Sequence, residues 1–103
     1  MFYNVLKAKD LVDLDHSAKC DKNILLEKDG CGLVAVALKK DEIIDTHTAM
    51  EDAAVYVIDG EIEIHFDAEK FKIDKGEILM FKKDDQHKVL ALKDSKFLIF
   101  KVW

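Results

Sequence analysis

The chain has 103 residues, half of them hydrophobic, and a formal net charge of −5. This length predicts one domain, with a core large enough to fold without a disulfide or a structural metal. The acidic balance argues against a nucleic-acid partner, and so does the fact that all 16 basic residues are lysine, because phosphate and guanine recognition favours a basic surface and arginine forks.

The two cysteines, Cys20 and Cys31, form no C-x-x-C pair and lack the spacing of a zinc site, so we expect two reduced thiols. The N-terminus has no long apolar run and does not resemble a signal peptide. No apolar segment approaches the roughly 20 residues that a membrane helix needs. These features predict a cytoplasmic protein that does not associate with membranes.

The N-terminal part of the chain has no clear periodicity. We expect residues 1–23 to be an extension and residues 24–103 to be the folded barrel within a single domain, 1–103. Residues 2–6 could be a short edge strand, and residues 9–16 could be a helical turn or a loop. The pattern leaves both alternatives open.

The first two predicted strands flank an Asp29-Gly30 turn, which is typical of a hairpin. Residues 23–28 read as one strand. The run Leu33–Leu38 is continuously apolar and only six residues long, with turn-forming residues on both sides. These features predict a strand that is buried on both of its faces.

The second half of the chain alternates between apolar and polar residues. The alternation is clearest after the Asp59-Gly60 turn, where Ile62, Ile64 and Phe66 share one face. Further strands are expected at residues 43–47, 55–58, 71–73, 78–81, 89–92 and 97–102, with another turn at Lys75-Gly76. About nine strands with short turns and no helix of ten residues predict a sandwich or barrel.

Residues 41–60 resemble the first motif of the cupin superfamily. That motif runs Gly, five residues, His-x-His, three or four residues, Glu, six residues, Gly. His47 and Gly60 match it, whereas Asp41, Ala49 and Ala53 replace the first glycine, the second histidine and the glutamate. The stretch is also similar to small bacterial cupins that carry H-x-A-x-x-D-A here.

Residues 76–91 resemble the second cupin motif, which runs Gly, five residues, Pro-x-Gly, two residues, His, three residues, Asn. Gly76 and His87 match it, and Lys82, Asp84 and Ala91 replace the proline, the second glycine and the asparagine. The resemblance extends over residues 24–102. It implies an all-β, single-domain jelly-roll barrel, and it leaves the activity open, because this fold carries isomerases, dioxygenases, storage proteins and ligand-sensing domains.

The resemblance also suggests where a metal would bind. A complete cupin site offers three imidazoles and one carboxylate, which suits iron, manganese, nickel or zinc. Here only His47 and His87 remain. Asp45 shares a face with His47 if the strand alternates that far, and Glu51 and Asp52 could reach back over the mouth. We expect His65 and His16 to lie in solvent. His47 and His87 are therefore either ligands of a weakly bound divalent ion or barrel residues that hold no tight metal.

We predict that the protein binds a small organic molecule inside the barrel, with His47 and His87 as polar anchors and no certain cofactor. The predicted apolar wall is Val55, Val57, Ile64, Ile78, Met80 and Val89. One alternative is a metal-dependent isomerase or oxygenase that uses both histidines and a supplementary carboxylate. Another is a non-catalytic interaction or storage protein. Small cupins resemble one another in forming dimers. We therefore also expect a homodimer that buries outward-facing residues such as Tyr56, Leu90 and Leu92 together with the N-terminal segment.

Overall fold

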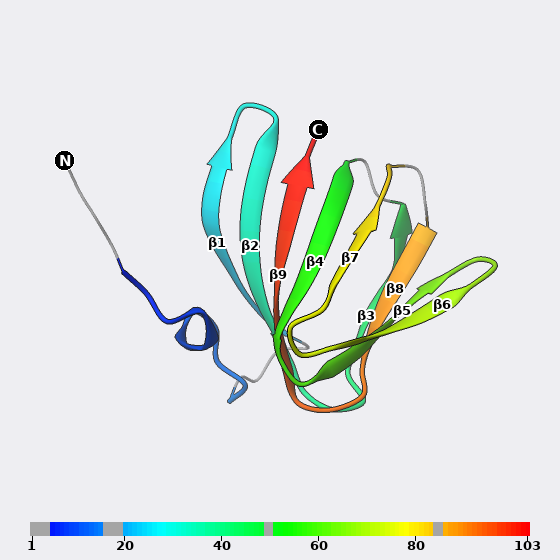
Figure 1. Cartoon of the computed structure of the whole chain (residues 1–103), viewed down its shortest axis with the longest axis horizontal. Helices are drawn as coiled ribbons and strands as arrows, with labels where there is room; N and C mark the ends of the chain where they lie inside the picture. Colours follow the sequence, from blue (N-terminus) through cyan, green and yellow to red (C-terminus); the bar gives the residue numbers. More distant parts are fainter. Residues whose placement is uncertain (1–4, 16–19, 49–50, 84–85) are drawn as a thin grey trace.

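The computed structural model describes residues 5–15, 20–48, 51–83 and 86–103, and for residues 45–48 it describes the backbone alone. These residues form two antiparallel sheets (Figure 1). A 3-10 helix, η1, comes first (Ala8–Asp10). The strands are β1 (Asp21–Lys28), β2 (Cys31–Leu38), β3 (Ile43–Thr48), β4 (Asp52–Asp59), β5 (Glu61–Phe66), β6 (Lys70–Asp74), β7 (Ile78–Phe81), β8 (Gln86–Ala91) and β9 (Ser95–Val102).

The five-stranded sheet has the order β1-β2-β9-β4-β7, and the four-stranded sheet has the order β3-β8-β5-β6. The two sheets approach each other at one end and diverge toward the other (Figure 1). This arrangement confirms the prediction of an all-β jelly-roll barrel. No helix among the described residues is long and apolar enough to cross a membrane.

The main core lies between the sheets. Phe97 of β9, Leu38 of β2, and Ile62 and Ile64 of β5 are fully buried there. Inward residues come from alternate positions of each strand, as the period of a pleated strand requires. The polar hydroxyl of Ser95 is also buried, and it bonds to backbone groups of Glu61 and Lys93.

A second, smaller core lies on the outer face of the five-stranded sheet. Val12 is buried there against Ala35 and Ala37 of β2, next to Leu11 and Leu14. The prediction that the run 33–38 is buried on both faces is therefore confirmed for residues 35–38, whereas Leu33 and Val34 are only partly buried. The open question about residues 9–16 is answered for its described part: a single 3-10 turn ends at Asp10, and the irregular chain after it packs on the sheet.

Strand β7 presents the opposite face from the one predicted. Ile78 and Met80, which were predicted in the barrel wall, are 59% and 73% exposed, whereas Leu79 and Phe81 pack against the core. The strand consists of four apolar residues in a row, so its sequence carries no alternation that could reveal which face is buried. Pairing decides instead, because Leu79 stands opposite the inward-facing Val55 of β4.

Candidate functional site: a cavity between the sheets

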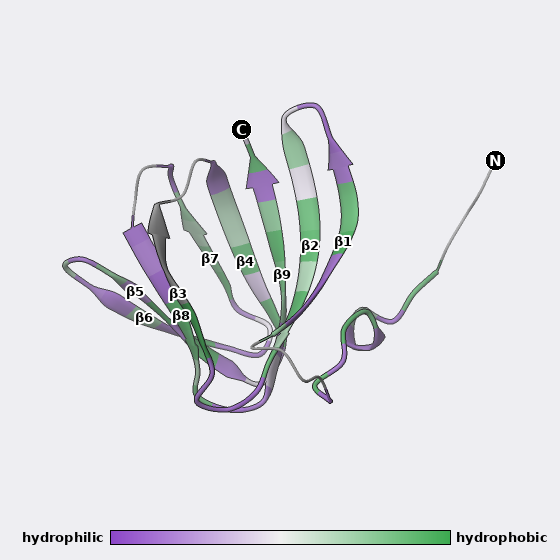
Figure 2. Cartoon of the chain, turned by 180° about the vertical axis from the view of Figure 1, so that it is seen from behind, coloured by the Kyte–Doolittle hydropathy of each residue, from purple (hydrophilic) through white to green (hydrophobic). Residues whose placement is uncertain are grey.

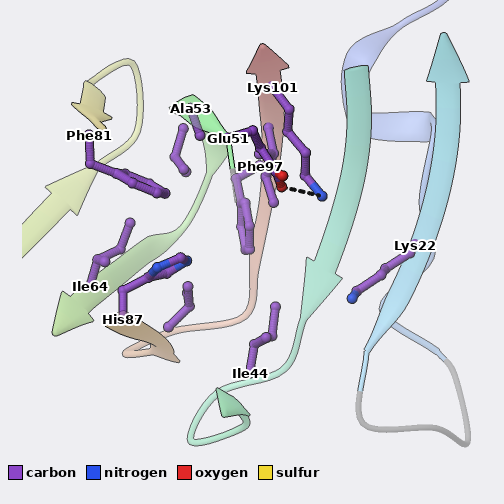
Figure 3. Close-up of a pocket in the computed structure, with 12 residues that line it drawn as sticks. Lys22, Ile44, Glu51, Ala53, Ile64, Phe81, His87, Phe97 and Lys101 are labelled. Atoms are coloured by element: carbon purple, nitrogen blue, oxygen red, sulfur yellow. Dashed lines mark ion pairs between the residues drawn. The ribbon is translucent and has the colours of Figure 1, made fainter. Parts of the chain in front are cut away.

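A cavity of about 80 Å³ lies between the two sheets. Figure 3 shows its lining, which comes from both sheets. The lining residues are Lys22, Ile44, Glu51, Ala53, Val55, Ile64, Phe81, His87, Val89, Phe97, Ile99 and Lys101. A space of this size holds several waters or a short organic group, because one water needs only about 15 Å³ by the same measure.

His87 of β8 is the most buried polar side chain of this lining, with 7% of its surface exposed. Its ring lies beside the Phe81 ring, at a centroid distance of 4.6 Å, and 6.1 Å from the ring of Phe66. The Phe66 and Phe81 rings also contact each other edge to face, 5.6 Å apart. Two aromatic rings therefore hold the imidazole plane at one end of the cavity, which limits the orientations that its nitrogens can take.

The backbones of the two motif histidines are brought together by the sheet. His47 of β3 is the direct cross-strand partner of His87. The side chains of His47 and Asp45 lie outside the described residues, as do Ala49 and His16. The register between β3 and β8 shifts between Ile44 and His47. The expected placement of Asp45 beside His47 assumed strict alternation along the strand. That alternation does not hold across this irregularity.

Charged side chains gather at the other end of the cavity. The Lys101 ammonium lies 3.7 Å from a carboxylate oxygen of Glu51, and Lys22 comes from the edge strand β1 (Figure 3). Glu51 thus lines the cavity, as the sequence suggested that it could. Asp52 does not: it is exposed, and its carboxylate accepts a hydrogen bond from the backbone amide of Lys83.

Three of the predicted wall residues line the cavity: Val55, Ile64 and Val89. Val57 is fully buried but belongs to the core outside this lining, and the exposed Ile78 and Met80 lie on the outer face. Whether the lining residues bind a ligand stays a prediction.

The side chains around the cavity can be compared with the ligands that a metal ion requires. No group of three or more His, Cys, Asp or Glu side chains among the described residues could hold a metal ion. Ala53, at the position of the motif glutamate, offers only a methyl group to the cavity. Glu51 is paired with Lys101, and His65 lies away from this lining, where it contacts Glu63. The described side chains alone do not assemble a cupin metal centre.

Sequence reasoning missed several residues of the lining. Phe97, Ile99 and Lys101 occupy alternate positions of β9, so simple alternation could have placed Lys101 inside. Lys22 was assigned to the N-terminal extension, but β1 already begins at Asp21. Its cross-strand partner is Val36, a core residue, so Lys22 stands on the concave face of the sheet.

The comparisons with known proteins agree with this architecture. The family model described as a cupin domain matches residues 34–103. The chain belongs to the cupin domain family. No curated protein matches the chain.

Many solved structures share the fold. A conserved protein of unknown function from Streptococcus pyogenes is 22% identical, with a TM-score of 0.88 over 99% of this chain and 89% of that one. KdgF from a Halomonas species is 17% identical, with a TM-score of 0.79 over 100% of this chain and 96% of that one. A cupin 2 conserved barrel domain protein from Leptotrichia buccalis is 28% identical, with a TM-score of 0.77 over 85% of this chain and 43% of that one.

One departure from the cupin motif has a simple backbone explanation. Asp41, which replaces the first motif glycine, has a φ of 72°, in the left-handed region that glycine adopts most easily. Aspartate is among the few other residues that enter this region without a large penalty. The chain before β3 therefore has a left-handed residue at the position of the first motif glycine, although that residue is an aspartate.

Proposed function

We propose that this cupin binds a small organic molecule in the cavity between its sheets, with His87 as the buried polar anchor and His47 as its partner. The observation that carries the proposal is the cavity itself, whose walls are mainly apolar and which holds a nearly buried imidazole at one end. Apolar walls with a few polar groups are the usual composition of a small-molecule site.

The size of the cavity restricts the ligand. At about 80 Å³ it is smaller than the pockets that enclose drug-sized molecules, which measure roughly 300–1,000 Å³. A ligand would therefore place a short group inside and leave the rest toward the open end. The ring of Phe81, 4.6 Å from the imidazole, offers this group an aromatic surface.

The test uses two alanines that are neighbours on β4. Ala53 lines the cavity, whereas Ala54 does not. Ala53→Leu should fill the cavity and abolish the chemical-shift changes that a small-molecule library causes at His87 and Val89 in an ¹⁵N-labelled protein. Ala54→Leu, the matched control, should leave those changes intact. Ligands that bind both variants equally well would contradict the proposal.

The rival proposal is a metal-dependent enzyme that uses His47, His87 and a carboxylate. Elemental analysis of untagged protein distinguishes this enzyme from a protein that only binds an organic ligand. Stoichiometric transition metal after gentle purification would favour the enzyme. An organic ligand bound without metal would favour the binding protein.

We also propose that the protein forms a homodimer through the outer face of the five-stranded sheet. Adjacent β9, β4 and β7 place Phe100, Ala54 and Met80 in one cross-strand row, and Phe100 and Met80 are 48% and 73% exposed. Figure 2 shows hydrophobic colouring along much of these strands. Exposed apolar side chains in a contiguous row are typical of an association surface. This proposal is separate from ligand binding, because the row lies on the opposite face from the cavity.

A further inference from the structure

The charged end of the cavity bears on the class of ligand. The charged side chains of the lining are Lys22, Lys101 and Glu51. Glu51 pairs with Lys101, so its negative charge offsets one of the two lysines. The three side chains together therefore carry one net positive charge. This excess is notable in a chain with a net charge of −5.

Cross-strand register places both lysines on the concave face. Lys22 stands opposite the buried Val36, and Lys101 stands opposite Ala53, which itself lines the cavity. In Figure 3 the amino ends of both lysines lie on one side of the lining, with Phe81 and His87 on the other. The cavity is therefore amphipathic, with a cationic end and an aromatic end.

We infer that the ligand is a small monocarboxylate, whose carboxylate lies at Lys22 and Lys101 and whose short apolar part extends toward Phe81 and His87. This inference rests on the proposed function. One net positive charge suits a monoanion better than a phosphate dianion. No carboxylate of the described residues lies within ion-pair distance of the Lys22 ammonium, so this group is available to a ligand. Glu27 lies in an adjacent groove and is not part of the lining.

A structural role for Lys22 is the competing explanation. β1 is an edge strand, and an inward-pointing charge on an edge strand discourages pairing with another chain. That role predicts that Lys22→Gln changes the tendency to associate and leaves carboxylate binding unchanged. The two explanations therefore differ in what the substitution does to ligand affinity.

The test compares hexanoate with hexanamide, which has nearly the same shape without the charge. Both are titrated into the ¹⁵N-labelled full chain, and the amide shifts of Ala53, His87 and Val89 report binding. We expect hexanoate to bind at least about fivefold more tightly than hexanamide, because a charge-assisted hydrogen bond is stronger than a neutral one. The ratio should fall when salt is raised, since the cationic end is open to solvent.

Variants locate the effect. Lys22→Gln and Lys101→Gln should each weaken hexanoate binding about fivefold and leave hexanamide binding unchanged. Lys28→Gln, an exposed position near the other end of β1 and outside the lining, is the matched control and should change neither. Equal affinities for the acid and the amide, or an unchanged acid affinity in Lys22→Gln, would overturn the inference and leave the proposed function standing. If neither compound shifts the three amides, the inference fails, and the library test with Ala53→Leu and Ala54→Leu decides the proposed function separately.

Discussion

Two glycines with nearly the same backbone conformation should respond very differently to alanine. Gly60 and Gly76 have φ angles of 87° and 86°, and each closes a turn between strands. An alanine at such an angle costs about 1–2 kcal/mol, whatever surrounds it. The Cβ of an alanine at position 76 would meet no atom within 4 Å. For Gly76→Ala we therefore expect only this conformational cost.

At position 60 the same Cβ would collide with the neighbouring turn. It would lie 2.3 Å from the carbonyl oxygen of Asp94 and 2.4 Å from the hydroxyl of Ser95. That hydroxyl is buried and accepts a hydrogen bond of 3.0 Å from the amide of Glu61, so it cannot move aside freely. Overpacking of this kind costs about 1–3 kcal/mol, and losing the hydrogen bond costs about 1 kcal/mol more. The total for Gly60→Ala is therefore about 3–6 kcal/mol.

Urea unfolding followed by the far-ultraviolet strand signal measures both variants against the parent chain. For a domain of this size, 1 kcal/mol corresponds to roughly 4–8 °C in melting temperature. Gly76→Ala should lower the free energy of unfolding by about 1–2 kcal/mol and Gly60→Ala by about 3–6 kcal/mol, and the latter corresponds to a melting temperature lower by more than about 12 °C. Ser95→Ala combined with Gly60→Ala should show a coupling energy of at least about 0.5 kcal/mol. Equal losses at the two glycines would refute the packing of residues 94 and 95 over the Gly60 turn.

Four further outcomes are expected. The far-ultraviolet spectrum should be strand-dominated, and a helix content above roughly a third would contradict the fold. Phe81→Ala should lower the free energy of unfolding in urea by about 2–3 kcal/mol, because the ring packs on His87 and Phe66. Met80→Ala should lower it by less than about 1 kcal/mol, because Met80 is exposed. The reverse order would show that β7 buries its other face. Chelator should leave the melting temperature nearly unchanged, since two imidazoles hold a divalent ion weakly. Any metal affinity should fall as the pH is lowered, because protonated imidazole does not coordinate. A drop in melting temperature of more than about 10 °C on chelation would require a third or fourth protein ligand. Light scattering at micromolar concentration should give a dimer mass that Phe100→Lys reduces to a monomer mass, and a monomeric parent chain would disprove the dimer.

The sequence was sufficient for features that depend on neighbouring residues. The Asp-Gly pairs located the turns at Gly30 and Gly60, and alternation from Glu61 to Phe66 assigned the buried face of β5 correctly. Both signals are local, because a turn needs a particular φ at one residue and a half-covered strand needs a period of two. The spacing of four residues also indicated the cupin family, and therefore the barrel: His47, Gly60, Gly76 and His87.

Only the tertiary structure decided features that depend on pairing between distant strands. The uniformly apolar β7 could have buried either face, and its pairing with β4 turned Phe81 inward and Met80 outward. The irregularity in β3 interrupts a period that looked continuous in sequence. Lys22 and Lys101 are 79 positions apart in the numbering, and they meet in one lining because β1 and β9 both flank β2. A cavity is made by side chains from both sheets, so its shape and charge follow from sheet order and register, which no single segment of the sequence encodes.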